Sequence, residues 1–183
     1  MTDLSRLPTR DARRRLRAVV EAPRGARVKL TYEPEIEAFE FGKALPLGMH
    51  YPYDWGFFPS TRAADGDPLD AMIFHDTETY PGVVVACRPL GVVLLTQRGD
   101  GRRRERNDRV IAVPHDARLD EVRAVPARVR DEIERFFLSV VFFEPKDARV
   151  EGWQGPRAAE RVIREAQRRY EREAHGERSR AKT

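Results

Sequence analysis

Short hydrophobic segments alternate with polar, turn-forming positions over residues 17–115. The apolar segments are rich in Val and aromatic residues, and Gly, Pro or Asp separates each from the next. This pattern is typical of β-strands and predicts them at residues 17–23, 27–34, 38–45, 69–75, 83–96 and 108–115. Because most intervals between the segments are short, we expect an antiparallel sheet closed into a barrel.

A helical period replaces this alternation in the last third of the chain. Segments 126–141 and 155–174 each carry apolar residues on one helical face, at Val129, Ile133, Phe136, Phe137 and Val140, and at Ala159, Val162, Ile163, Ala166 and Tyr170. We therefore expect an α+β fold in which two C-terminal helices flank the barrel. A single domain spans residues 17–175 in this prediction, after an N-terminal extension (1–16, with room for a short helix) and before a frayed tail (176–183).

The composition is that of a packed globular protein. The 183 residues are 40% hydrophobic and 35% charged, and this length can bury a sizeable core. No apolar run approaches the roughly 20 residues that cross a bilayer, and the N-terminus carries charges where a signal peptide is apolar. Cys87 is the only cysteine, which excludes an internal disulfide and agrees with a reducing compartment. We expect a cytoplasmic protein with no membrane partner.

Arginine supplies most of the positive charge. The net charge is +4, and lysine occurs only at positions 29, 43, 146 and 182. The Arg-rich stretches at 10–17, 98–109 and 168–182 also contain acidic residues, which is typical of solvated helix faces and loops. The few lysines therefore stand out as candidates for a specific role.

Three aspartates within residues 65–70 (DGDPLD) mark the segment with the most specific chemistry. Asp-Gly and a following Pro form turns, so a polar loop between strands accounts for the residue types alone. Neighbouring carboxylates also repel one another unless a cation or buried donors compensate them, and such oxygen ligands suit Mg²⁺. Leu69 and Asp70 stand where a calcium-binding helix-loop-helix needs an oxygen ligand and a Gly, which excludes that motif. The segment predicts a turn, a metal site, or both.

Residues 65–70 resemble the signature of the soluble, barrel-type (family I) inorganic pyrophosphatases, Asp-x-Asp-Pro-aliphatic-Asp leading into a core strand. Other segments resemble the same family, in order along the chain: VVEAPRGARVKLTYE (19–33), MHYPYDWGFFPST (49–61), GVVVACRPLGVVLLT (82–96), VIAVPH (110–115) and VEGW (150–153). The resemblance covers about residues 17 to 172. It implies a mainly antiparallel, OB-like β-barrel of about five strands plus hairpins.

The resemblance also implies an activity, namely Mg²⁺-dependent hydrolysis of inorganic pyrophosphate by a homo-oligomeric enzyme. On the matching positions, Asp65 and Asp70 hold Mg²⁺, and Glu21 supports the cation shell. Asp67 borders the metal and acts as the catalytic base for the attacking water. These roles divide one acidic cluster between metal binding and proton transfer.

Three further positions match the side of that family's site that binds the substrate. Lys29 and Lys43 bind phosphate oxygens as point charges, and Tyr51 donates a hydrogen bond to them. Lys43 stands where the family has Arg, which keeps the charge but loses the bidentate geometry. Trp55 likewise stands for a Tyr, and Thr31 for a Glu.

Several positions depart from the family pattern. Two metal-ligand aspartates and the Tyr-Lys pair that holds the leaving phosphate are replaced by Gln97, Asn107, Val140 and Val141. Candidates to restore the lost groups are Asp100 or Asp108 as a carboxylate, Lys146 as a lysine, and Arg98 or an arginine of segment 102–106 as a positive charge beside the phosphate.

These departures leave two alternatives open. One is a related phosphohydrolase that acts on another phosphorylated compound. The other is a non-catalytic barrel that binds anions or nucleic acid, for which the Arg-rich loop at 98–109 is suited. Nucleic acid is the less favoured partner, because the carboxylates of residues 65–70 repel phosphates and that loop contains no aromatic residue.

Overall fold

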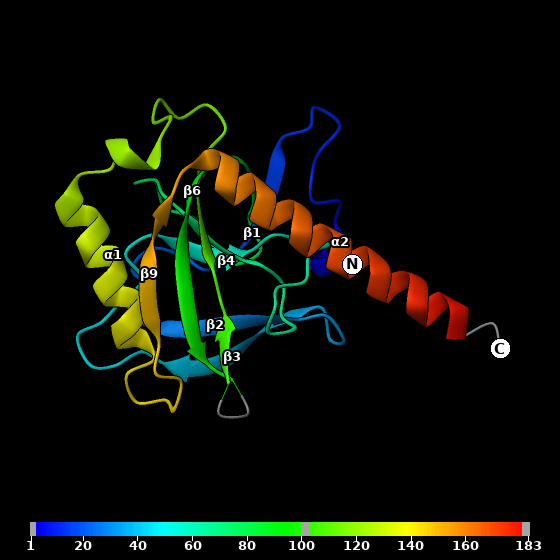
Figure 1. Ribbon diagram of the computed structural model, residues 1–183, viewed down its shortest axis with the longest axis horizontal. Helices are drawn as coiled ribbons and strands as arrows, with labels where there is room; N and C mark the ends of the chain where they lie inside the picture. The colour runs from blue at the N-terminus through cyan, green and yellow to red at the C-terminus, as the bar shows by residue number, and fades with distance from the viewer. Residues whose placement is uncertain (1–2, 100–102, 181–183) are drawn as a thin grey trace.

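Five strands form a closed ring at the centre of the molecule (Figure 1). The computed structural model describes residues 3–99 and 103–180, with side chains as far as residue 176. In spatial order the ring contains β1 (Leu16–Ala22), β4 (Asp54–Phe57), β5 (Asp70–Ile73), β8 (Arg109–Pro114) and β6 (Val84–Arg98). β6 pairs back with β1, and all pairs in the ring are antiparallel except β5 with β8. The expected mainly antiparallel, OB-like barrel of about five strands is confirmed.

Four more strands extend this barrel. β2 (Val28–Glu33) and β3 (Ala38–Ala44) form a separate hairpin, while β7 (Arg104–Arg106) and β9 (Arg149–Gln154) pair with β6. The alternation pattern did not predict β4, β7 or β9. β7 has only three residues, and glycines interrupt the pattern of the other two.

Two helices follow the barrel strands, as predicted. α1 (Ala127–Val140) buries Ile133, Phe136 and Phe137, and α2 (Pro156–Arg180) lies across the barrel, with its C-terminal half projecting beyond it in Figure 1. α2 continues through 176–180, where a frayed tail was expected, and residues 181–183 lie outside the described part of the chain. A short 3-10 turn, η2 (Val122–Ala124), precedes α1.

The N-terminal extension contains a single 3-10 turn, η1 (Leu4–Arg6), instead of a helix over 3–16. Arg10 pairs with Leu16 in an isolated bridge, and the Asp11 side chain accepts hydrogen bonds from the backbone N–H groups of Arg13 and Arg15. These contacts hold the segment as a tight turn against the start of β1. Aspartate competes for backbone donors in this way, which explains why residues 10–16 form a turn rather than helix.

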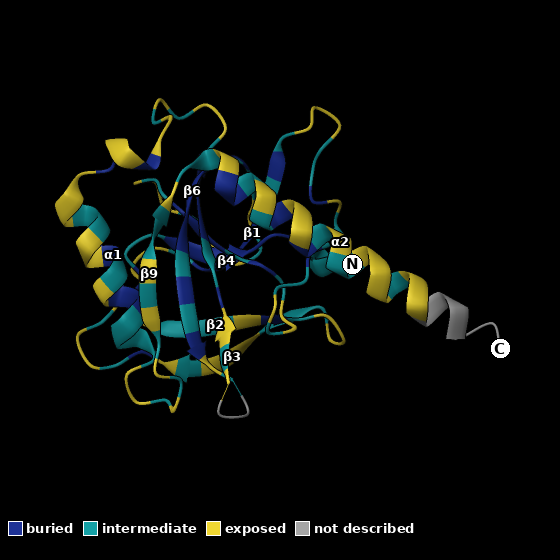
Figure 2. Ribbon diagram, in the orientation of Figure 1, coloured by how far each residue is buried: buried dark blue, intermediate teal, exposed yellow. Residues whose placement is uncertain are grey.

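The core lies on both faces of the strands, as the buried positions in Figure 2 indicate. In β5, Ala71 and Ile73 pack in the cluster that includes α2, while Met72 between them packs in the cluster that includes α1. The period of two in a strand explains this division, because successive side chains point to opposite faces. No helix in the described part of the chain is long and apolar enough to cross a membrane.

Candidate active site

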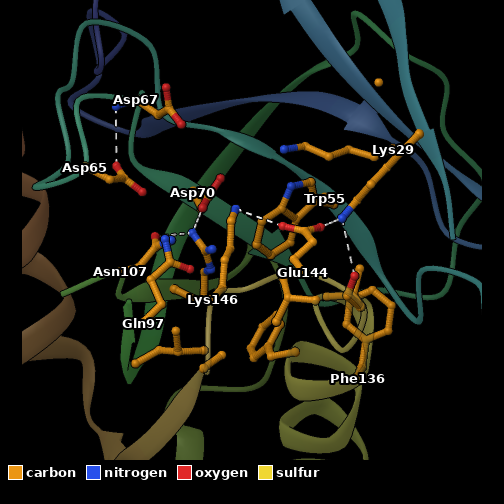
Figure 3. Close-up of a pocket in the computed structure, with 18 of the residues that line it drawn as sticks. Lys29, Trp55, Asp65, Asp67, Asp70, Gln97, Asn107, Phe136, Glu144 and Lys146 are labelled. Atoms are coloured by element: carbon orange, nitrogen blue, oxygen red, sulfur yellow. Dashed lines mark hydrogen bonds and ion pairs between the residues drawn. The ribbon is translucent and has the colours of Figure 1, made fainter. Parts of the chain in front are cut away.

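A cavity of about 390 Å³ lies between the barrel, the β2–β3 hairpin and the C-terminal end of α1. Its charged lining residues are Lys29, Lys43, Asp65, Asp67, Asp70, Arg109, Glu144 and Lys146. Figure 3 shows Asp65 and Asp67 on one side of the cavity and Glu144, with Lys146 beside it, on the other. The structure therefore brings together residues that are up to about 117 positions apart in the sequence, from Lys29 to Lys146.

The aspartate segment is both a turn and a wall of the cavity. Gly66 has φ +91°, a conformation that suits glycine, and the Ala63 N–H donates to the Asp67 carbonyl oxygen at 2.7 Å. Asp65 Oδ1 accepts a hydrogen bond of 3.3 Å from the Asp67 N–H. The chain then enters β5, whose first residue, Asp70, lines the same cavity. The turn and the cluster of carboxylates are thus compatible in one segment.

Arg109 neutralises this side from within the barrel. It is the first residue of β8, and its guanidinium forms an ion pair with Asp70. It also donates to Asn107 Oδ1 at 2.6 Å and lies 5.2 Å from the centre of the Trp55 ring. Burial lowers the pKa of Arg109 to about 10, against the opposing effects of Asp65, Tyr51 and Asp67. The positive charge therefore remains at neutral pH, in a fixed position.

The opposite side of the cavity contains three lysines and one carboxylate. Lys29 and Lys43 are register partners across the β2–β3 hairpin, and Lys146 comes from the loop after α1. Burial and then the charges of Lys29 and Lys146 lower the pKa of Lys43. Glu144 forms ion pairs with Lys43 and, at 3.2 Å, with Lys146. These groups form a basic side of the cavity, the lysine side, whose charge is partly neutralised by Glu144.

Tyr51 and Glu21 occupy the remaining predicted positions. Tyr51 lines the cavity, and burial raises the pKa of its hydroxyl, which keeps it a hydrogen-bond donor at neutral pH. Glu21 lies in an adjoining cavity of about 330 Å³ that Lys29, Asp67 and Asp70 also line. Burial raises the pKa of Glu21 to about 7, although its Oε1 accepts a 2.8 Å hydrogen bond from the Tyr32 N–H. Glu21 thus lies behind the aspartates.

The three aspartates have the right ligand atoms for a divalent cation, but their side chains are not arranged around a common point. Their carboxylate oxygens are the ligands that Mg²⁺ and similar hard cations prefer. Within residues 3–99 and 103–180, however, no group of three or more His, Cys, Asp or Glu side chains is arranged to hold a metal ion. Asp70 is paired with Arg109, whereas Asp65 and Asp67 stay on the turn. A cation would therefore bind to Asp65 and Asp67 and share Asp70 with Arg109.

The altered positions all border the cavity. Gln97, Asn107, Val140 and Val141 line it, so neutral and apolar groups stand where the resemblance implies charged or polar ones. Gln97 and Asn107 are buried, at 7% and 4% exposure, and both amides are inside the molecule rather than on a solvated rim. The cavity thus has fewer carboxylates than the resemblance implies.

Asp108, Arg98 and Arg104, which were suggested replacements, do not line the cavity. Asp108 accepts a hydrogen bond from the Leu95 N–H and pairs with Arg106, and it does not line the cavity. Arg104 pairs with Asp147, and Arg98 borders a smaller neighbouring cavity. Asp100, Gly101 and Arg102 lie outside the described residues.

Among the described candidates, Lys146 does line the cavity. Arg109, Trp55 and Glu144 also line it, and their contacts there were not predicted from the sequence. Trp55 stands at a position of the family pattern and Arg109 lies two residues after another, Asn107, so both were places to look for site contacts. Glu144 had no such signal, because one glutamate in a loop is usually solvated.

Comparisons with known proteins point to one family. A family model described as inorganic pyrophosphatase matches residues 18–171. The inorganic pyrophosphatase of Nostoc sp. is 38% identical over 157 residues, which cover 83% of this chain and 89% of the relative. That of Thermus thermophilus is 36% identical over 178 residues, 93% of this chain and 99% of the relative.

Solved structures agree with these relatives. The crystal structure of inorganic pyrophosphatase from Thermus thermophilus is similar to this chain with a TM-score of 0.84 and 33% sequence identity, covering 93% of this chain and 99% of that one. The structure of an inorganic pyrophosphatase from Coxiella burnetii gives a TM-score of 0.81 and 27% identity, covering 90% and 99%.

Proposed function

Since the chain belongs to the inorganic pyrophosphatase family, we propose that it is an inorganic diphosphatase that hydrolyses pyrophosphate to two phosphates with Mg²⁺. The observation that carries this proposal is the division of one cavity into an aspartate side and a lysine side. Hydrolysis of pyrophosphate needs both, because a water must be activated next to a phosphoryl group while the leaving phosphate is held by cations.

The aspartate side supports the attack on the phosphorus atom. Asp65, Asp67 and Asp70 would hold the cation, with Glu21 behind them. When bound, Mg²⁺ supplies positive charge to the phosphate oxygens and makes nearby water more acidic. Asp67 accepts the proton of the attacking water, since it lies on the cavity wall and forms no ion pair with Arg109.

The lysine side orients the phosphate that leaves. Lys29 and Lys43 attract its oxygens, and Tyr51 donates a hydrogen bond. Lys146 adds a third ammonium group where Val140 and Val141 provide none. These donors stabilise the charge that builds up on the leaving oxygen as the P–O bond breaks.

The charge balance of the cavity explains why a cation is needed. Among the residues that the structure describes, four carboxylates and four basic side chains line the cavity, and the formal charges of these eight groups cancel. Pyrophosphate carries several negative charges, and a neutral cavity does not compensate them. Because Gln97 and Asn107 add no charge, we infer that the chain binds fewer divalent cations than it would with aspartates there.

The test is phosphate release from pyrophosphate by the purified chain across a Mg²⁺ titration. We expect release that depends on Mg²⁺ and falls at least about 100-fold in Asp67→Asn, which loses the base. The matched control is Asp76→Asn, because Asp76 is exposed and lies outside the cavity. Equal release by Asp67→Asn and the wild type would contradict the role of Asp67, and no release by the wild type would contradict the proposed function.

A different phosphohydrolase substrate is the second candidate, because the leaving side contains the unexpected Glu144. The same assay with phosphate monoesters and nucleotides tests it. Nucleic acid binding has weaker support, since Arg104 and Arg106 of the Arg-rich loop are paired with aspartates. The homo-oligomer and the cytoplasmic location stay predictions, which sedimentation analysis and cell fractionation test.

A further inference from the structure

Glu144 places a negative charge on the lysine side of the cavity. It lies in the turn after α1, where its N–H donates to the Val141 carbonyl oxygen at 3.0 Å. Figure 3 shows its carboxylate pointing into the cavity, near the side chain of Lys146. One oxygen contacts Lys43 Nζ, and the other lies 3.2 Å from Lys146 Nζ. A single carboxylate therefore bridges two of the three lysines.

The lysines converge in the way that a phosphate would require. Lys29 and Lys43 face each other across the hairpin, and the charges of Lys29 and Lys146 both lower the pKa of Lys43. Ammonium groups this close repel one another, so an anion between them is favourable. A phosphate and the Glu144 carboxylate offer the same type of oxygen acceptor to these donors.

We propose that the Glu144 carboxylate competes with a bound phosphate for Lys43 and Lys146 and thereby weakens the binding of this anion. The competition itself does not depend on the proposed function. Its consequence, that Glu144 promotes release of the product phosphate, rests on that function. Glu144 occupies the two ammonium groups when the phosphate leaves, so that they are not left unpaired. It is a specificity-determining residue of the lysine side.

The turn that carries Glu144 can move enough for its carboxylate to leave Lys43 and Lys146 when a phosphate binds them. Phe142 and Phe143, which precede it, are 76% and 82% exposed, so the turn is not anchored in the core. Few buried apolar contacts allow a segment to move at little cost in free energy. Glu144 itself keeps 27% of its side-chain surface exposed, which leaves it a path to solvent. The carboxylate can thus leave the lysines without unfolding α1.

Binding of inorganic phosphate without Mg²⁺ tests the competition apart from catalysis. Isothermal titration calorimetry should give Glu144→Gln about tenfold higher affinity than the wild type, because the competing charge is gone while the side-chain size is kept. Glu165→Gln is the matched control, since this exposed glutamate of α2 makes the same charge change outside the cavity. It should leave the affinity unchanged.

A double-mutant cycle identifies the partner lysines. In a Lys43→Gln background, Glu144→Gln should raise phosphate affinity by less than about threefold, because one of the two competed donors is already absent. An equal gain in phosphate affinity in both backgrounds would mean that Glu144 acts through the electrostatic potential of the whole cavity rather than through its contact with Lys43. Equal phosphate affinity of wild type and Glu144→Gln would overturn the proposal.

Turnover separates this proposal from the proposed function. If pyrophosphate is hydrolysed, Glu144→Gln should lower both the KM and the inhibition constant of product phosphate, while Glu165→Gln changes neither. If pyrophosphate is not hydrolysed but Glu144→Gln still binds phosphate more tightly, the proposed function fails and the competition stands. Hydrolysis with unchanged product inhibition in Glu144→Gln would contradict the proposed role in release.

Discussion

The two charged sides of the cavity are each partly neutralised, but by different kinds of structure. On the aspartate side, Asp70 and its partner Arg109 are the first residues of the paired strands β5 and β8. On the lysine side, Glu144 reaches Lys43 and Lys146 from a loop. The first counter-charge is fixed by the barrel, and the second belongs to a segment with exposed neighbours.

This difference shows where the site tolerates change. Arg109 has three contacts, to Asp70, Asn107 and Trp55, so replacing it leaves several groups without their partner. Glu144 is a partly exposed carboxylate, and water can replace its contacts. We therefore expect stability to depend on the aspartate side and ligand affinity to depend on the lysine side.

Glu21→Gln should change how stability depends on pH. Burial raises the pKa of Glu21 from 4.5 to about 7, so the folded state favours the neutral acid. The resulting stabilisation is fully present below the unfolded pKa and is lost as the pH rises through about 7. Between pH 4.5 and 8 the wild type should lose about 3 kcal/mol of unfolding free energy relative to the variant. Urea unfolding of metal-free protein measures this, and a constant difference would contradict it.

Arg109→Met should destabilise the chain by about 2 kcal/mol, because it leaves Asp70 in a mostly buried place without its cation. Lys43→Met is the counterpart on the other side, and we expect it to cost less than about 0.5 kcal/mol, since Lys43 is partly exposed and Glu144 keeps Lys146. Urea denaturation at pH 7 compares the two. Similar losses for both variants would remove the distinction between a fixed and a replaceable counter-charge.

Asn107→Asp should raise the affinity for Mn²⁺ about tenfold, because it adds a carboxylate of nearly the same size to the aspartate side. Asn107 is buried at the cavity wall and contacts Arg109. Gln154→Glu, an exposed amide of β9, is the control for charge alone. Electron paramagnetic resonance of free Mn²⁺ measures both. Unchanged Mn²⁺ affinity in Asn107→Asp would show that the missing carboxylate at position 107 does not limit cation binding.

Trp55→Phe should show the smallest effect, a coupling of about 1 kcal/mol with Arg109 in a double-mutant cycle. The guanidinium lies over the indole ring, and Phe gives a weaker cation–π contact. Unfolding free energies of Trp55→Phe, Arg109→Met and the double variant provide the coupling. Additive losses would mean that Trp55 stabilises the chain by packing alone, without supporting Arg109.

The barrel strands and the two helices could be predicted from the sequence alone. The short apolar runs in 17–23 and 108–115 and the helical period in 126–141 each mark residues that must be buried, so they identify the elements wherever these lie in space. Residues 65–70 could likewise be recognised from the sequence, because Asp-Gly and Pro favour a turn and neighbouring carboxylates repel one another unless a cation is bound. The same local logic failed for β4, β7 and β9, which are short or interrupted by glycine.

Which charges meet depends on how the chain folds. Asp70 with Arg109 and Lys43 with Glu144 are 39 and 101 residues apart, and no pattern in the sequence pairs them. Among the basic residues that the structure describes, Lys29, Lys43, Arg109 and Lys146 border the cavity, while Arg104 and Arg106 do not. Ion pairs depend on distance in space and on burial, and these are set by strand register and by loop paths rather than by residue type. That is why the sequence could locate an acidic turn, whereas the balance of charge around it became visible only in the folded chain.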